Sequence, residues 1–301
     1  MKPLTGLIPL LPFLLLSVLF SAFFAPQCVS GKEVQLTEDL QLRIADAFMD
    51  EAEYYRAITE YKKFLIIFPD SERLDYILFR IGMANYLGEE YDSSVRSFNT
   101  VRQRCPQSFY VPQSLYFEGL SYWRLKKYPE AKAAFQALAD DYPSSDHAPL
   151  AIVSDAMLSL DQENADASRH DLHRLITSYP DYLSSTSEKQ AFMLLHQYQN
   201  LPRKSEAIAC IMSALIPGSG YVYAEHYRDG LTAFLINGLA IAGTVTAIYH
   251  ENYAVAAIVG GIGLPFYFGN IYGSANAVKK WNIALRRELR NRISVTLNYD
   301  F

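Results

Sequence analysis

Few residues of this 301-residue chain have the types and spacing that metal binding or catalysis requires. His170 and His173 share one face of a predicted helix with Asp166 one turn earlier, so the three could hold a metal ion. We favour the alternative of a solvated helix face. Ser219 lies between two glycines, but the GxSxG frame and the preceding strand of a nucleophile elbow are missing.

The motifs of the common catalytic and cofactor sites are missing as well. The sequence has no CxxC, HExxH or Walker pattern, and acidic pairs such as Glu89-Glu90 lie at predicted turns as solvating charges. A glycine-rich stretch begins at Pro217, but the Lys-Ser/Thr pair that completes a phosphate-binding loop does not follow it. We therefore predict that the chain is not an enzyme and needs no metal and no cofactor.

The elements that would position any site repeat with a period of 37 residues. The period aligns four prolines, Pro69, Pro106, Pro143 and Pro180. It also aligns an aromatic position at Tyr54, Tyr91 and Tyr128, and a small position at Ala45, Gly82, Gly119 and Ala156. A strict period of this length predicts a stack of similar helical hairpins.

The third repeat illustrates how one unit would pack. Two helices each carry a stripe at helical spacing, formed by Leu115, Gly119 and Tyr122 and by Ala131, Phe135 and Leu138. The small residues Gly119 and Ala131 allow the two backbones to approach closely, and Pro143 cannot continue a helix. Because a single hairpin cannot bury its apolar face, neighbouring hairpins must share a core, which predicts an all-α solenoid.

The order small, aromatic, small, large apolar, then Pro resembles the tetratricopeptide repeat, whose usual unit is 34 residues. The stretches around Pro69 and Pro143 resemble the variant found in periplasmic outer-membrane-assembly lipoproteins. The resemblance covers roughly residues 36–182 and fades in the fourth repeat, where Ser159 and Ala165 replace aromatic residues. It implies a right-handed solenoid over residues 31–200, with about four repeats and a closing helix.

In that family the first helix of each repeat lines the concave face, which implies a groove for a protein partner. The residues at these positions are Phe79, Met83, Tyr86, Tyr116, Leu120, Trp123, Arg124, Val153 and Met157. Aromatic rings beside Arg124 suit an extended or helical peptide. The alternative is that these side chains pack against the adjoining helix. Under the groove hypothesis, Trp123→Ala weakens partner capture and leaves thermal stability nearly unchanged.

Charge and the first thirty residues bear on where the solenoid works. Residues 31–200 carry 17 Lys and Arg against 26 Asp and Glu, which argues against nucleic-acid binding.

Residues 1–30 predict a signal peptide, because Lys2 precedes an apolar run from Leu4 to Phe24 and Cys28-Val29-Ser30 suits cleavage. The alternatives are an uncleaved anchor and, with a poor lipobox, a lipoprotein. In each of these three alternatives the solenoid is exported.

Residues 201–278 predict a membrane domain. Two almost wholly apolar runs of about 19 residues, Leu231 to Tyr249 and Ala254 to Tyr272, are each long enough to cross a bilayer. The short link between them forces an antiparallel hairpin, and Gly269 and Gly273 form a GxxxG pair suited to helix packing. The alternative is a hairpin buried inside a soluble domain.

The stretch before this hairpin resembles a PGxGQxY motif of small, poorly characterised bacterial membrane domains. The matching residues are Pro217, Gly218, Gly220, Tyr223 and Gly230. The proline would end a helix, and Gly218 and Gly220 would permit positive φ in a tight turn that directs the chain into the membrane. Tyr221 stands where the motif has Gln, so the sequence departs from the pattern there.

Residues 279–301 predict a basic helix and a strand-like tail. Six basic residues between Lys279 and Arg292 accompany one acidic residue, and the positive-inside rule places them in the cytoplasm. If the solenoid is exported, the chain must then cross the membrane three times after it, with residues 205–224 as the third span. If residues 205–224 instead form an interfacial helix, the chain crosses twice.

Residues 292–301 alternate apolar and polar side chains. This tail would pair with a partner's sheet edge or be disordered, and its terminal Phe301 also resembles the recognition signal of outer-membrane barrels.

Together these patterns predict an exported, membrane-anchored repeat scaffold that binds proteins in the bacterial cell envelope, with the bilayer as its other partner. We favour the inner membrane with the repeats in the periplasm, and a role in envelope or outer-membrane protein assembly. The alternative is a membrane-biogenesis or transport accessory whose glycine-rich hairpin is the active part. Deleting residues 201–301 would separate the two, because only a scaffold would still capture its partner.

Overall fold

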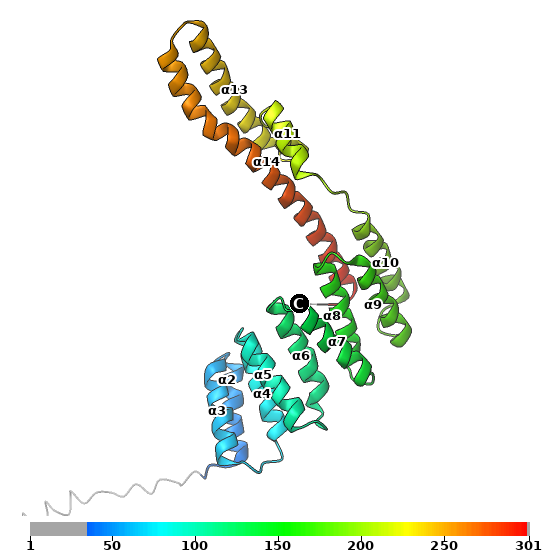
Figure 1. Cartoon of the computed structure of the whole chain (residues 1–301). Helices are drawn as coiled ribbons and strands as arrows, with labels where there is room; N and C mark the ends of the chain where they lie inside the picture. The colour runs from blue at the N-terminus through cyan, green and yellow to red at the C-terminus, as the bar shows by residue number, and fades with distance from the viewer. Residues whose placement is uncertain (1–34, 300–301) are drawn as a thin grey trace, which may run out of the picture.

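In a computed structural model that describes residues 35–299, the chain is a stack of helical hairpins followed by one long hairpin (Figure 1). The predicted signal peptide and Phe301 lie outside the described residues. The stack consists of α2 (Glu38–Asp50), α3 (Tyr54–Ile67), α4 (Leu74–Leu87), α5 (Tyr91–Arg104), α6 (Tyr110–Arg124), α7 (Tyr128–Asp141), α8 (Ala148–Asp161), α9 (Ala165–Ser178) and α10 (Ser185–Gln199). We call this stack the repeat array.

The 37-residue period sets where the second helix of each hairpin begins. These helices begin at Tyr54, Tyr91, Tyr128 and Ala165, and each ends two residues before the proline of its repeat. The fourth hairpin therefore forms in full although its aromatic signature has faded. Ser168 and Leu172 keep the buried positions of that repeat, and burial rather than the aromatic residue maintains the helix.

The turn between the two helices of each hairpin has a feature that the sequence does not reveal. Ala52, Glu89, Lys126 and Glu163, again 37 residues apart, have φ of 58°, 62°, 60° and 59°. Each caps its first helix in the left-handed conformation that glycine usually supplies. In the third hairpin the next amide, of Lys127, donates to the carbonyl of Tyr122 at 2.9 Å, which closes the cap.

Small residues allow the two helices of a hairpin to approach. A Cβ placed on Gly119 would lie 2.5 Å from Cε1 of Phe135, and one on Gly82 would lie 2.5 Å from Cε1 of Phe98. Both rings are buried, so the glycines form the floor on which the aromatic residue of the second helix packs. In the third repeat the ring of Phe135, rather than the backbone of the second helix, therefore lies against Gly119.

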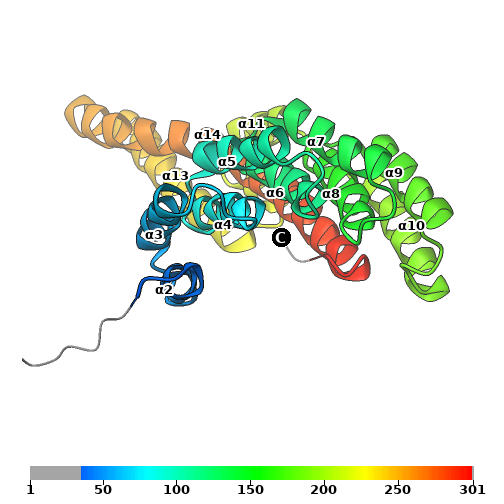
Figure 2. The same cartoon turned by 90° about the horizontal axis from the view of Figure 1, so that it is seen from below.

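The remaining helices are α11 (Glu206–Leu215), α12 (Ser219–Tyr223), α13 (Tyr227–Tyr249) and α14 (Tyr253–Thr296). α13 and α14 form an antiparallel hairpin that projects away from the repeat array (Figure 1). α14 then continues without a break, although Pro265 lies inside it, and its last turns return to the array. There they pack against α8 and α10 (Figure 2).

The strand predicted over residues 292–301 is wrong over its described part, because α14 extends to Thr296. Leu289, Ile293 and Leu297 are buried at intervals of four, which is a helical stripe, whereas Val295 is exposed. Over a few residues, alternation and a four-residue stripe share positions, so the pattern did not distinguish them. The basic segment and the tail as far as Thr296 are thus one continuous helix with the second long apolar run.

The fit of Phe135 on Gly119 predicts a cost for a single methyl group. We expect Gly119→Ala to destabilise the chain by about 1–3 kcal/mol, because the ring must shift within a packed core. Thermal unfolding of the purified full chain measures this effect. Gly238→Ala is the matched control, since a Cβ there meets nothing within 4 Å. Equal midpoints for the two variants would contradict the packing described.

Candidate functional site

The residues predicted to line the concave groove lie on α4, α6 and α8, but most of them are buried. The buried ones are Phe79, Tyr116, Leu120, Trp123, Val153 and Met157. Met83 and Tyr86 are half-buried, and Arg124 is exposed. The packing alternative therefore describes these six positions, including Phe79 on α4, and leaves Met83, Tyr86 and Arg124 for the groove hypothesis.

The end of α14 and the residues after it cover this part of the concave face. Leu289, Ile293, Leu297 and Tyr299 belong to the same buried cluster as Tyr116, Trp123, Val153 and Met157. α8 is consequently buried over almost its whole length. The covering element is the chain's own carboxy-terminal segment, which sequence reasoning did not anticipate.

Charged groups secure the same contact. Arg290 donates to the Asp161 carboxylate, and Nε1 of Trp123 donates to Oδ2 of Asp161 at 3.0 Å. The Arg290 guanidinium also lies 6.0 Å from the centroid of the Trp123 ring, and Arg286 pairs with Glu163. The basic segment thus docks on acidic groups at the end of α8 and in the turn that follows.

Tyr299 is the last described residue, and it is buried against the repeat array. Its side chain is 3% exposed, and its hydroxyl lies 3.0 Å from Oγ of Ser154 on α8. Burial raises the pKa of Tyr299 well above its usual value, and burial likewise raises the pKa of Tyr116 beside it. Both phenols are therefore neutral hydrogen-bonding groups within the contact.

The half of the concave face nearer the amino terminus carries the more accessible positions. Met83, Tyr86 and Arg124 are its accessible or half-accessible predicted groove residues. Burial raises the pKa of Tyr86, and the positive charge of Arg124 and a hydrogen bond from it oppose that rise. The ring of Tyr86 packs edge-on against Phe117 at 5.2 Å between centroids, so the aromatic surface beside Arg124 is held in place.

The PGxGQxY-like residues build a second site, where α11 and α12 pack onto the long hairpin. Gly218 has φ of 88°, and its amide donates to Oδ1 of Asn270 at 2.9 Å. Nδ2 of Asn270 in turn donates to the Ser213 carbonyl at 3.1 Å. A Cβ on Gly218 would lie 2.1 Å from the carbonyl oxygen of Gly230, and a Cβ on Gly230 would lie 2.9 Å from Cγ2 of Val222, so neither position has room for a side chain.

The remaining motif residues have similar packing roles. The amide of Gly220 donates to Oγ of Ser213 at 3.1 Å, and a Cβ on Gly220 would lie 2.3 Å from the Ala209 carbonyl oxygen. The Tyr223 hydroxyl accepts from the Ser205 amide at 3.1 Å. Pro217 lies between α11 and α12, where the chain turns. The motif thus fixes α11 and α12 against α14.

Gly269 and Gly273 do not pack α14 against another long helix, which corrects the GxxxG interpretation. A Cβ on Gly273 would lie 1.9 Å from the hydroxyl oxygen of Tyr221, and one on Gly269 meets nothing within 4 Å. Tyr221, the residue that departs from the motif, therefore occupies the space over Gly273. The long helices approach each other instead at Gly263, where a Cβ would lie 2.9 Å from Ala240.

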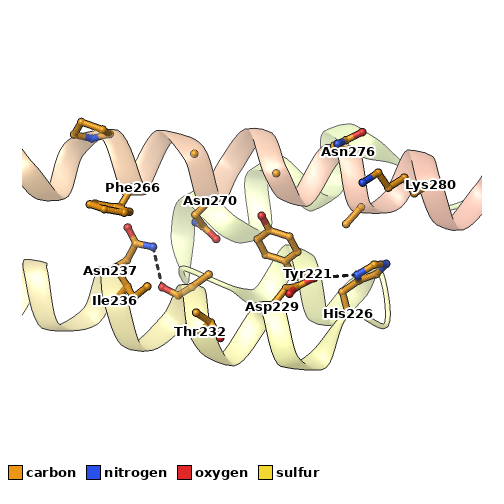
Figure 3. Close-up of a pocket in the computed structure, with 15 residues that line it drawn as sticks. Tyr221, His226, Asp229, Thr232, Ile236, Asn237, Phe266, Asn270, Asn276 and Lys280 are labelled. Carbon is orange, nitrogen blue, oxygen red and sulfur yellow. Dashed lines mark hydrogen bonds and ion pairs between the residues drawn. The ribbon is translucent and has the colours of Figure 1, made fainter.

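A pocket of about 480 Å³ opens between α12, α13 and α14 beside this turn, and we call it the hairpin pocket (Figure 3). Its lining includes Tyr221, His226, Asp229, Ile236, Asn237, Phe266, Gly269, Asn270, Asn276 and Lys280. Asn237 and Asn270 were missed by sequence reasoning. The available signal was an amide side chain within a long apolar run, since buried polar groups in such helices are costly.

The candidate metal ligands on α9 are not brought together with further ligands. Among residues 35–299, no group of three His, Cys, Asp or Glu side chains could hold a metal ion. His170 lies beside Asp171, and the ring of His173 packs on Phe192 at 4.6 Å between centroids.

Comparison with protein families identifies the repeats. The tetratricopeptide repeat model matches residues 76–108 and 113–145, so the chain contains tetratricopeptide repeats, as the resemblance indicated. No curated protein matches.

Similar solved structures include a tetratricopeptide repeat protein from Parabacteroides merdae, with 12% identity, a TM-score of 0.43, and coverage of 85% of this chain and 98% of that one. The apo form of RapI has 12% identity and a TM-score of 0.45, covering 88% and 93% of the two chains. The Rap conjugation gene regulator of plasmid pLS20, in complex with the Phr* peptide, has 15% identity and a TM-score of 0.41, covering 99% and 89%.

The burial of Trp123 corrects the expectation that its removal would leave stability unchanged. We expect Trp123→Ala to lower the free energy of unfolding by about 3–5 kcal/mol, because a large buried ring and its hydrogen bond to Asp161 are lost. Thermal unfolding measures the loss. Arg124→Ala, one residue along on the exposed side, is expected to shift the midpoint little. A Trp123→Ala variant as stable as the native chain would contradict the docking of α14.

Proposed function

We propose that this chain is a membrane-anchored scaffold of the bacterial cell envelope, in which the α13–α14 hairpin inserts in a bilayer and the repeat array binds a protein or peptide partner. Helical-repeat arrays present extended concave surfaces that are suited to such binding. The array's own tail covers the surface over α8, so the proposal assigns the partner to the open half around Met83, Tyr86 and Arg124.

Exposure of apolar side chains supports the insertion of the hairpin. Among the described residues, α13 and α14 are the two helices long and apolar enough to cross a bilayer, judged by length and composition. Only 6% and 17% of their most apolar stretches are buried, which argues against a hairpin inside a soluble core. Leu239, Ile262 and Phe268 are each more than half exposed. A lipid environment would cover these side chains.

The continuity of α14 is the observation that carries the proposed topology. One helix runs from the hairpin to the repeat array, so the array and the basic segment lie on the same side of the membrane. The hairpin then crosses twice, and α11, with ten residues, is too short to be a third span. Arg286 and Arg290 pair with the array, so docking accounts for them without a cytoplasmic location, and we keep the proposal that the array is exported.

Labelling from one side of the membrane tests this arrangement. In a chain whose native cysteines are replaced by Ser, we expect Glu72→Cys in the array and Arg287→Cys in the basic segment to react together with a membrane-impermeant maleimide in intact cells. The same variants with permeabilised membranes give the total signal. Reaction of only one of the two sites in intact cells would contradict two crossings.

Site-specific crosslinking tests partner binding. We expect a photoreactive residue at Met83 to trap a protein in native membranes, because this half-buried position is one of the more accessible predicted groove residues. Tyr55, which is 85% exposed on α3, serves as the matched control. Adding Arg124→Glu should reduce the Met83 product at least severalfold while shifting the midpoint of thermal unfolding little. Equal trapping from both positions, or no response to Arg124→Glu, would contradict a groove-bound partner.

A further inference from the structure

We propose that the hairpin pocket binds a single membrane lipid, and that it selects a phosphate-bearing lipid with an amide N–H or a hydroxyl next to its acyl chains. This inference rests on the proposed insertion of the hairpin in a bilayer. The pocket lies between α12 and the two helices of the hairpin, and its lining includes both charged and apolar side chains, as expected at the level where lipid headgroups and chains join.

The pocket is polar at one end and apolar at the other. His226, Asp229 and Lys280 gather at the end near α12, whereas Ile236 and Phe266 line the end that lies deeper in the hairpin (Figure 3). This gradient matches an amphipathic ligand whose headgroup lies at the charged end and whose chains follow the apolar end. A soluble metabolite would not require the exposed apolar walls.

Lys280 supplies the charge for a phosphate. His226 is engaged, since its Nδ1 lies 3.1 Å from Oδ2 of Asp229, but Lys280 has no ion-pair partner among residues 35–299. Basic side chains between membrane helices bind lipid headgroups by this attraction. The charged end is therefore suited to a headgroup that carries a phosphate and an adjoining cationic group. Lys280 would bind the phosphate, and the Asp229 carboxylate would pair with the cationic group.

Asn237 indicates which hydrogen-bonding group a ligand would need deeper in the pocket. Its side chain is 2% exposed, and its Nδ2 donates to the Ala233 carbonyl at 2.8 Å. Its Oδ1 has no hydrogen-bond partner among the described residues. A buried acceptor without a donor is unfavourable, so this oxygen marks a place for a donor that the protein does not provide.

The second buried amide, Asn270, differs from Asn237 in its hydrogen bonds. Asn270 uses both ends of its side chain, accepting from Gly218 and donating to Ser213. It therefore maintains the fold, and Asn237 is left to contact a ligand. Ester-linked diacyl phospholipids carry only acceptors beside their chains and would leave Oδ1 unsatisfied. An amide-linked or hydroxylated lipid carries a donor at that depth, so its selection follows from hydrogen-bond chemistry.

Two lipids that share a headgroup test the proposal. The full chain is placed in nanodiscs that contain equal amounts of sphingomyelin and diacylphosphatidylcholine with matched chains, and the lipids retained after mild release are measured by native mass spectrometry. We expect about tenfold enrichment of sphingomyelin, the effect of one hydrogen bond. Asn237→Leu, which keeps the side-chain shape, should return the ratio to that of the nanodisc.

Control variants separate selection from general effects. Thr246→Val removes an exposed hydroxyl from the same helix outside the pocket and should keep the enrichment. Lys280→Gln should reduce retention of both lipids and leave their ratio unchanged. Phe266→Trp, which fills the apolar end, should lower retention of both and provides a second test if Asn237→Leu unfolds.

The outcomes distinguish this proposal from the one on which it rests. Equal retention of the two lipids by the native chain, or unchanged enrichment in Asn237→Leu, would overturn the lipid selection and indicate that water satisfies Asn237. A chain that fails to incorporate in nanodiscs, or to float with vesicles of either lipid, would instead overturn the proposed insertion. Incorporation without retained lipid would leave insertion standing and reject the pocket.

Discussion

The structure depends on one uninterrupted helix. α14 begins at the tip of the long hairpin, forms the wall against which α11 and α12 pack, and ends on the concave face of the repeat array. Because the helix is continuous, Leu289, Ile293 and Leu297, which are buried at one end, and the apolar surface at the other end belong to the same element.

Polar contacts give this arrangement its specificity at both ends. Asp161 accepts from both Trp123 and Arg290, so one carboxylate ties α6, α8 and α14 together. At the other end Asn270 connects the Gly218 turn to Ser213 on α11. Asn237 has the same chemical group in a similar setting but lacks a second partner, which is why we assign it to a ligand rather than to the fold.

Local patterns in the sequence predicted the fold well, and distant contacts were not predictable. The period placed the second helices correctly from Tyr54 to Ala165, because each hairpin packs on its neighbours in sequence. The tail's contact joins α14 to a helix more than a hundred residues earlier, and no local pattern encodes such a pairing. The alternation around Ile293 was misread for a related reason, since the partner surface decides which side chains are buried. The residues with left-handed conformation, such as Glu89 and Lys126, are not glycines, so composition could not mark them.

The length of α14 also sets the distance between the long hairpin and the repeat array. From Lys279 to Thr296 the helix rises by roughly 27 Å at 1.5 Å per residue. A flexible tether of the same length would let the array explore a range of distances and tilts above a surface. If the hairpin inserts in a bilayer as proposed, a continuous helix would instead hold the array at one height above the bilayer and in one orientation. A partner of the proposed groove would then have to reach that level, so reach as well as affinity would select which proteins bind.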